Sequence, residues 1–232
     1  MIEDVLEQLV EDYYSSKAGF FTKHNVKFRP LKDDETYDSQ MDSVHSDIDV
    51  IAVCTSIPNT VNAISCKSWQ GGLNIAVFME SIENAIVQQP NKTKGRRDLW
   101  CTFRELCIRK WTRSFVEKLR EETSQPPNNK MELNYFIVCT LITPGSIKDK
   151  AAFENSETIK KHFRDVSDVN FNLRVLTVSQ LVQDLIERIK NKATPSVEMS
   201  ELSRMIQILL AAGCEIKVPS GTNNEGLGLY CQ

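Results

Sequence analysis

The sequence predicts an α/β fold in which a central mixed β-sheet is flanked by helices. Short runs rich in β-branched residues alternate along the chain with stretches of helical periodicity, which is the pattern of a sheet covered by helices. The runs 46–53 and 63–70 are joined by a loop that contains Pro58 and Asn59, so we expect an antiparallel hairpin. Later strands are separated by helices, and residues 133–143 are almost wholly apolar, as in a strand buried on both faces.

Periodicity and turn residues predict the elements of the first half. Apolar residues recur at helical spacing over 2–18, and Gly19 is suited to end that helix. Residues 20–31 alternate loosely and predict a first strand, whereas the polar stretch 32–46 predicts a loop. After the hairpin, Gly71 and Gly72 interrupt the second strand. The elements expected next are a helix over 73–89, a basic loop over 91–95 and a long helix over 98–122.

The second half begins with a linker, residues 124–129, which contains Pro126 and Pro127. The elements expected after it are the buried strand 133–143, a helix around 151–163, a strand over 173–178, a helix capped by Ser179 that runs to about 192, and a last helix over 199–212. We expect one main domain over 1–192, with 193–232 forming a C-terminal helix and flexible tail within the same domain.

Composition predicts a soluble cytoplasmic protein. The 232 residues are 41% hydrophobic and 25% charged, as in an ordinary globular protein. The longest apolar runs, such as 206–212, fall far short of the roughly 20 residues that cross a membrane. The acidic N-terminus lacks the basic and apolar regions of a signal peptide. Seven cysteines without a CxxC pair favour reduced thiols.

A basic stretch between Lys92 and Arg113 stands out against a net charge of −3. It holds eight lysines and arginines and two acids. One interpretation is a solvated helix face. The other is a surface that follows nucleic-acid phosphates, with Trp100 and Trp111 available to pack or stack. On the second interpretation, the residues expected to contact DNA are Lys92, Lys94, Arg96, Arg97 and Arg104.

The hairpin carries the residues with the clearest chemistry. Ser65 and Lys67 are two apart, so an extended strand points both to one face, and Asp49 lies on the neighbouring strand. A carboxylate and an amine placed together can hold a divalent metal and a water beside a phosphate. We expect Asp49 and the backbone carbonyl of Cys66 to be metal ligands, and Lys67 to orient or deprotonate the water. An ordinary Asp49–Lys67 salt bridge is the alternative, and spacing alone leaves both open.

The hairpin and the helix before it form an ordered set of motifs. Asp-Ile-Asp-Val-Ile-Ala-Val, a loop and Ile-Ser-Cys-Lys-Ser-Trp resemble the core of the PD-(D/E)XK nuclease superfamily, and more closely its Mrr-type restriction and Holliday-junction-resolvase-like branches. Residues 6–14, followed by Gly19-Phe20-Phe21, are similar to the glutamate-bearing helix and glycine–aromatic segment of those branches. The resemblance covers about 5–70 by motif and extends to about 190 by the order of elements. It implies a restriction-endonuclease-like fold.

The resemblance also implies roles for individual residues. Asp49 corresponds to the metal-binding aspartate and Lys67 to the catalytic lysine. Glu7 corresponds to the glutamate of the N-terminal helix, with Glu11 one turn along as the alternative and a solvated glutamate stripe as the competing interpretation. Ser65 departs from the family, which usually has Glu, Asp or sometimes Gln at that position.

Two explanations of Ser65 remain open. Some superfamily members with Ser-x-Lys recruit a glutamate from the following helix, where Glu80 and Glu83 lie, and Glu80 is then an expected metal ligand and catalytic residue. Otherwise the site is weakened. The resemblance therefore implies either an endonuclease that uses Mg²⁺ (or Mn²⁺) to hydrolyse DNA, or a catalytically inactive nuclease-fold protein acting as a nucleic-acid-binding or assembly subunit. The apolar face of 199–212 suggests a homodimer.

A third interpretation is an unrelated α/β protein. It would be indicated by a separation between Asp49 and Lys67 of more than about 8 Å, which is beyond the reach of a metal site.

Overall fold

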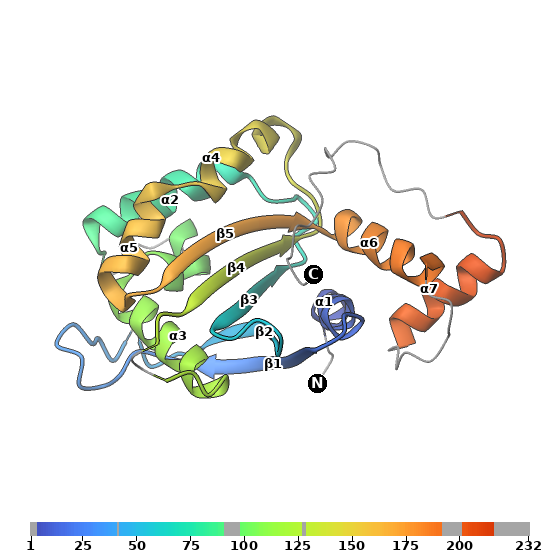
Figure 1. The fold of residues 1–232 in the computed structure, drawn as a ribbon. Coiled ribbons are helices and arrows are strands. Elements are labelled where there is room, and N and C mark those ends of the chain that lie inside the picture. The colour runs from blue at the N-terminus through green and yellow to red at the C-terminus, as the bar shows by residue number, and fades with distance from the viewer. Residues whose placement is uncertain (1–3, 41, 91–97, 127–128, 192–200, 216–232) are drawn as a thin grey trace.

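The chain folds around a five-stranded mixed sheet (Figure 1). The computed structural model describes residues 4–40, 42–90, 98–126, 129–191 and 201–215. The strands lie side by side in chain order, as β1 (Phe20–Phe28), β2 (Ser46–Cys54), β3 (Thr60–Lys67), β4 (Glu132–Cys139) and β5 (Asn170–Thr177). The first three strands pair antiparallel, and β3, β4 and β5 pair parallel. The predicted α/β class with a central mixed sheet is confirmed.

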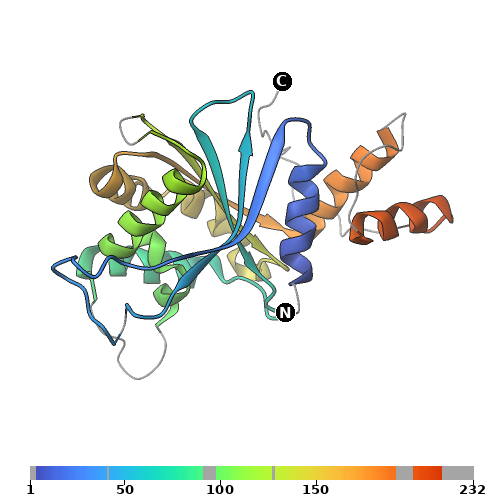
Figure 2. The same ribbon diagram turned by 90° about the horizontal axis from the view of Figure 1, so that it is seen from below.

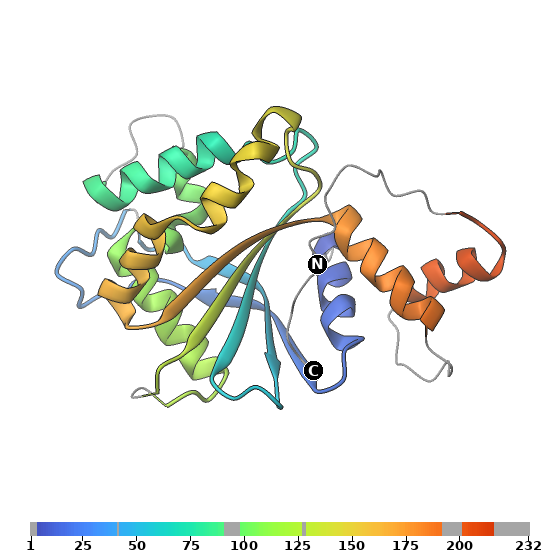
Figure 3. The same cartoon turned by 45° about the horizontal axis from the view of Figure 1, so that its top comes forward.

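Helices cover both faces of the sheet (Figures 2 and 3). On one face lie α1 (Val5–Ser15) and α6 (Val178–Asn191), and α7 (Glu201–Ala211) packs against both of these helices. The elements on the other face are α2 (Ile75–Gln88), the 3₁₀ helix η1 (Leu99–Leu106), α3 (Arg109–Glu122), the 3₁₀ helix η2 (Pro144–Asp149), α4 (Lys150–Glu154) and α5 (Glu157–Ser167).

Side-chain alternation along the strands divides the hydrophobic core in two. Val50 and Ile64 face the layer of α1 and α6, whereas Ile51 and Ala63 face the layer of α2 and α3. All four side chains are almost completely buried. Both clusters therefore rest on β2 and β3, the two strands of the predicted hairpin.

The expectation of one long helix over 98–122 is wrong. Phe103 has non-helical backbone angles, and Cys107 and Ile108 separate η1 from α3. The break turns the side chains of Phe103 and Glu105 inward, where they are 0% and 5% exposed. Burial of an aromatic ring offsets the loss of helical hydrogen bonds there.

Two other helix predictions also change. The expected helix over 151–163 is divided into α4 and α5, because Ser156 caps α5 by accepting a hydrogen bond from the backbone of Ile159. The expected cap at Ser179 is replaced by Thr177. The hydroxyl of Thr177 accepts a hydrogen bond from the backbone amide of Gln180. The side-chain oxygen of Gln180 in turn accepts one from the backbone amide of Thr177, and the two bonds form a capping box.

A row of asparagine side chains crosses the parallel half of the sheet. Asn62, Asn134 and Asn172 are register partners on β3, β4 and β5. The Asn134 amide donates to the Asn62 side chain at 3.0 Å, and the Asn172 amide donates to the Asn134 side chain at 3.1 Å. The Asn62 amide in turn donates to the Ala52 carbonyl on β2. The row therefore joins four neighbouring strands.

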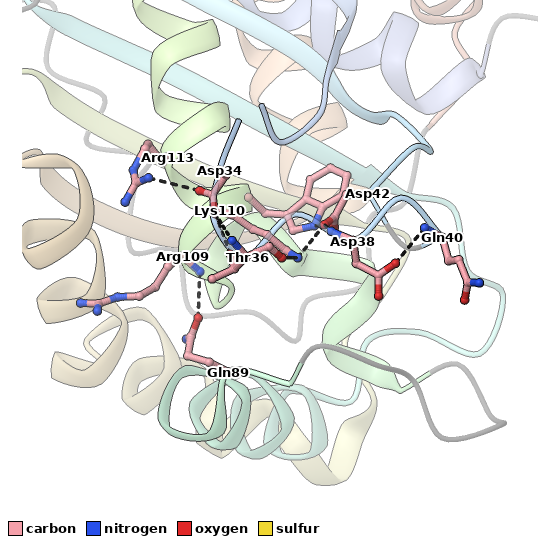
Figure 4. Close-up of polar contacts among 10 residues, drawn as sticks. Asp34, Thr36, Asp38, Gln40, Asp42, Gln89, Arg109, Lys110 and Arg113 are labelled. Carbon is pink, nitrogen blue, oxygen red and sulfur yellow. Dashed lines mark hydrogen bonds and ion pairs between the residues drawn. The ribbon is translucent and has the colours of Figure 1, made fainter. Parts of the chain in front are cut away.

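The expected polar loop before β2 is anchored on α3 (Figure 4). The Lys110 ammonium lies 2.6 Å from the Asp42 carboxylate and 2.8 Å from the Thr36 carbonyl, and the Trp111 indole donates to Asp42 at 3.1 Å. The side chains of Lys110 and Asp42 are 5% and 1% exposed. Arg113 pairs with Asp34 at the surface. Part of the basic stretch thus holds the loop in place.

Removal of the buried partner should destabilise the protein strongly. We expect Asp42→Ala to lower the free energy of unfolding by about 3–5 kcal/mol, because it leaves the Lys110 ammonium buried without its counter-charge. Urea denaturation measures the change. The matched control is Arg113→Ala, which removes the exposed partner of a surface pair and should cost about 1 kcal/mol or less. Equal losses of unfolding free energy in the two variants would contradict the conclusion that Asp42 and Lys110 form a buried ion pair.

Candidate functional site

The hairpin brings Asp49, Ser65 and Lys67 together. Val50 lies opposite Ile64 in the β2–β3 ladder, so Asp49 and Ser65 are adjacent across the two strands. One carboxylate oxygen of Asp49 is 3.5 Å from the Lys67 ammonium and 3.4 Å from the Ser65 hydroxyl. Asp49 and Lys67 are thus well within the distance expected of one site.

The backbone around Lys67 also engages the carboxylate. The Cys66 amide donates to the same Asp49 oxygen at 2.6 Å. The contact with Asp49 is therefore made by the amide of Cys66, and the role of its carbonyl as a metal ligand stays a prediction. Burial raises the pKa of Asp49, while the Lys67 charge and the Cys66 hydrogen bond act in the opposite direction. The carboxylate is held by several donors in a poorly solvated position.

An aromatic ring lies beside the lysine. The Lys67 ammonium is 5.6 Å from the centroid of the Phe103 ring, and the Lys67 side chain is 18% exposed. The distance is within the range of a cation–π interaction. Phe103 was not expected in the site, because the sequence predicts a continuous helix there and gives no signal of the break that turns its ring inward.

Glu7 on α1 belongs to the same electrostatic cluster. Its pKa is raised to about 7, first by burial and then by the negative charges of Asp49 and Asp4, whereas Lys67 and His24 lower it. The carboxylate of Glu11 instead accepts a hydrogen bond from the Thr22 hydroxyl and lies 3.4 Å from the His24 ring. Of the two expected glutamates, the structure therefore brings Glu7 to the site.

Asp4 contributes a third negative charge near this cluster. It caps α1 by accepting from the Leu6 amide, and its second oxygen accepts from the Ser68 hydroxyl at 3.3 Å. This contact ties the start of α1 to the end of β3. The sequence signal for it was an acidic residue before an apolar helix, which is typical of a cap.

The structure does not bring Glu80 to Asp49. Glu80 is exposed on α2, and none of the hydrogen bonds or ion pairs found in the described ranges joins it to Asp49 or Lys67. Glu83 accepts from the Ser156 hydroxyl at 2.6 Å, at the start of α5. The geometry therefore does not support Glu80 or Glu83 of α2 as the second metal-binding acid.

Within the part of the chain that the structure describes, no three His, Cys, Asp or Glu side chains are grouped closely enough to hold a metal. Glu7 is close enough to Asp49 for the aspartate charge to raise the pKa of its carboxyl group. Mg²⁺ commonly keeps several waters and is held by one or two carboxylates, so this donor set fits that ion. Burial is the main cause of the raised pKa of Glu7, and the like charge of Asp49, which a cation would compensate, is the second.

No family model, curated protein or solved structure matches this chain. The resemblance to PD-(D/E)XK nucleases thus stays a prediction, and the geometry of the hairpin is the main support for a function. Among the helices of the described residues, none is long and apolar enough to cross a membrane. The six cysteines in that part of the chain form no disulfide with one another.

The expected DNA-contacting residues divide into two groups. Lys92, Lys94, Arg96 and Arg97 lie outside the described residues. The Arg104 guanidinium lies 4.0 Å from the centroid of the Trp111 ring. Trp111 itself is buried, so its role here is packing rather than base stacking.

Two further positions near the hairpin escaped the sequence analysis. Asn25 has a left-handed backbone with φ of 55°, and the β1–β2 register omits the pair that it would form with Asp49. This conformation is uncommon outside glycine, although asparagine tolerates it. Tyr135 on β4 lies opposite Ala63 and donates a hydrogen bond to the buried Glu105 carboxylate at 2.5 Å, and burial raises the pKa of Tyr135. An apolar strand pattern gives no sign of either feature.

The helix expected to pair two copies is α7. Its Met205, Ile208 and Leu209 side chains are exposed, whereas Ile206 is buried with α1 and α6. Homodimer formation stays a prediction.

Glu7 should give stability a characteristic pH dependence. Its folded-state pKa is about 7 against an ordinary value of 4.5, so the folded protein binds more protons than the unfolded protein between these values. The protonated Glu7 side chain contributes its full stabilisation below about pH 4.5, and this contribution is lost as the pH rises through about 7. We expect Glu7→Gln to reduce the fall in Tm between about pH 5 and pH 8, as measured by thermal denaturation.

The exposed Glu80 provides the control for this measurement. Glu80→Gln should keep the wild-type pH profile because its side chain lies in solvent. If Glu7→Gln also keeps the wild-type profile, the raised pKa of Glu7 is contradicted.

Proposed function

We propose that this protein is a Mg²⁺- or Mn²⁺-dependent endonuclease that hydrolyses DNA phosphodiester bonds. The observation that carries the proposal is the Asp49–Lys67 pair on neighbouring strands, 3.5 Å apart and poorly exposed. The partly buried carboxyl group of Glu7 adds the second acid. This set provides the two carboxylates and the amine that metal-assisted phosphodiester hydrolysis uses.

The arrangement of the strands supports a restriction-endonuclease-like version of the fold. A helix, three antiparallel strands, further helices and a parallel strand follow one another in the chain. This is the order implied by the resemblance of residues 5–70 and the elements after them. The site lies where β3 ends and where α1 begins, so the first helix and the hairpin both contribute to it.

In the proposed mechanism, Asp49 and Glu7 would hold the divalent cation, with the Cys66 carbonyl as a further oxygen ligand. The cation would supply the charge that polarises the phosphate and lowers the pKa of water. Lys67 would orient the attacking water and assist removal of its proton. The nearby Phe103 ring limits the solvation of the Lys67 ammonium, and the Asp49 carboxylate fixes its direction.

Ser65 changes the charge of the site. A serine places a neutral hydroxyl where the superfamily usually has a carboxylate, so Glu7 has to provide the missing negative charge. The same substitution favours the second candidate function, a nuclease-fold protein that binds nucleic acid without cutting it. In that protein the three donors around Asp49, namely Ser65, Cys66 and Lys67, would serve stability alone.

A cleavage assay tests the enzyme. Wild-type protein with Mg²⁺ or Mn²⁺ should cut plasmid and linear DNA, and Lys67→Ala and Asp49→Asn should each lower the rate by about 10²-fold or more. The control variant is Lys160→Ala, which removes a lysine whose partner is the exposed Glu157 on α5 and should cut at the wild-type rate. If the wild type binds DNA but does not cut it with either metal, the non-catalytic function is correct instead.

A binding assay tests the basic stretch separately. Replacement of Lys92, Lys94, Arg96 and Arg97 by alanine should weaken DNA binding and reduce the slope of log K against log salt by about 0.9 per lost phosphate contact. Cleavage at saturating DNA should stay close to the wild-type rate, because these residues are not placed among the reacting groups. An unchanged salt slope would contradict their contact with phosphates.

A further inference from the structure

A partly buried tryptophan lies beside the candidate site. Trp69 follows Lys67 by two residues, just after the end of β3, and the centroid of its ring lies 6.4 Å from that of Phe103. The Lys67 ammonium lies 5.6 Å from the centroid of the same Phe103 ring. Trp69 and Lys67 are therefore neighbours around one aromatic side chain, and a ligand bound at Lys67 lies next to the indole.

Trp69 differs from the other two tryptophans in its exposure. Trp100 and Trp111 are 9% and 3% exposed, and the Trp111 indole donates a hydrogen bond to Asp42. Trp69 is only partly buried, and its indole N–H makes no hydrogen bond within the described ranges. A buried indole N–H usually has an acceptor. Because Trp69 has no buried atom without a partner, its N–H reaches solvent.

The Trp69 ring is held in place before any ligand binds. The Phe78 ring on α2 stacks on it, with centroids 5.3 Å apart and planes inclined by 16°. The Trp69 carbonyl accepts from the Gly72 amide at 3.1 Å, and Gly72 has φ of 76°. A Cβ at Gly72 would lie 2.9 Å from the Leu141 carbonyl oxygen, so this tight turn requires glycine. An aromatic surface ordered in advance loses little conformational entropy when a ligand stacks on it.

The charges around the site favour an uncharged contact with a nucleic acid. Asp49 and Asp4 both raise the pKa of Glu7, so three acids surround the position of Lys67. Their negative charge opposes the approach of a polyanion. Stacking of a nucleobase on an aromatic side chain adds affinity without adding charge. A base within a duplex has both faces covered, so this contact needs an unpaired nucleotide, or one that leaves the stack at an energetic cost.

We propose that Trp69 stacks on an unpaired nucleobase adjacent to the phosphate bound at Lys67. The preferred substrate is then DNA with an unpaired nucleotide at the cleavage site, as in a single strand. The position of cleavage rests on the proposed nuclease function. The stacking on Trp69 does not, because it also applies to a protein that binds nucleic acid without cutting it.

The affinity test compares a short single-stranded oligonucleotide of mixed sequence with the blunt duplex of the same sequence, with Ca²⁺ in place of Mg²⁺ to limit cleavage. We expect Trp69→Leu to raise the Kd for the single strand by about 5- to 150-fold, which is the usual effect of removing one base–aromatic stack. The Kd for the duplex should change by a smaller factor. Trp69→Phe keeps an aromatic face and should retain most of the affinity.

The matched control is Phe21→Leu. Phe21 is an aromatic residue that is 64% exposed, and it lies opposite Val53, towards the other end of the hairpin. Its variant should keep the wild-type Kd for both DNA forms. Thermal denaturation shows whether each variant is folded at the assay temperature, and Trp69→Phe continues the test if Trp69→Leu is not.

Tryptophan fluorescence provides a measurement that does not depend on a loss of affinity. Addition of the single strand should quench the emission of the wild type, and most of this quenching should disappear in Trp69→Phe. Trp100→Phe replaces a buried indole and should keep the quenching. Quenching that persists in Trp69→Phe overturns the proposal.

The outcomes separate the stacking from the nuclease function. An equal Kd for the single strand in the wild type and a folded Trp69→Leu overturns the stacking, even if the wild type cuts DNA. Equal weakening for the single strand and the duplex overturns the preference for an unpaired nucleotide. Weakened single-strand binding by Trp69→Leu, together with a wild type that does not cut, upholds the stacking and refutes the nuclease function.

Discussion

The structure depends on β3, which pairs antiparallel with β2 and parallel with β4. Its interior residues are buried on both faces, and burial decreases only at its two ends, Thr60 and Lys67. Because both hydrophobic clusters rest on this strand, its position is determined by packing from two sides. Lys67 stands where the buried strand meets solvent, so a rigid element carries a charged group to an accessible edge.

The electrostatics of the site follow from this position. Asp49 and Glu7 carry like charges in a partly buried region where water screens them poorly. Lys67 is the opposite charge in contact with Asp49. A third carboxylate at position 65 would add more repulsion, whereas the Ser65 hydroxyl donates a hydrogen bond. The serine therefore suits a site with one close cation and two acids.

Sequence periodicity predicted the parts of the fold that depend on regular patterns. The hairpin, the shared face of Ser65 and Lys67, and the contact between Asp49 and Lys67 all follow from alternation along two strands. The break between η1 and α3 does not, because residues 98–122 retain helical composition. This break is what turns Phe103 and Glu105 inward.

Charged residues were the hardest to place from the sequence. Lys110 belongs to a basic run, yet it is buried against Asp42 from a loop that is distant in the chain. Glu80 has the right spacing for a site residue and lies in solvent, whereas Glu105 was counted only as an acid within the basic stretch. The burial of a charge depends on a partner from another element, and local sequence does not reveal that partner.

The asparagine row has a consequence for how the sheet assembles. Parallel strands made of apolar residues can pair in several alignments of similar energy, and an amide that meets another amide in only one alignment distinguishes among them. A shift of β4 by two residues would separate the Asn62 and Asn134 amides and move Ile137 about 7 Å along β3 from its place opposite Ser65. The row thus favours one register of the strands during folding. Loss of the row should first make the conformation of the site heterogeneous, because the site lies at the other end of the same strands.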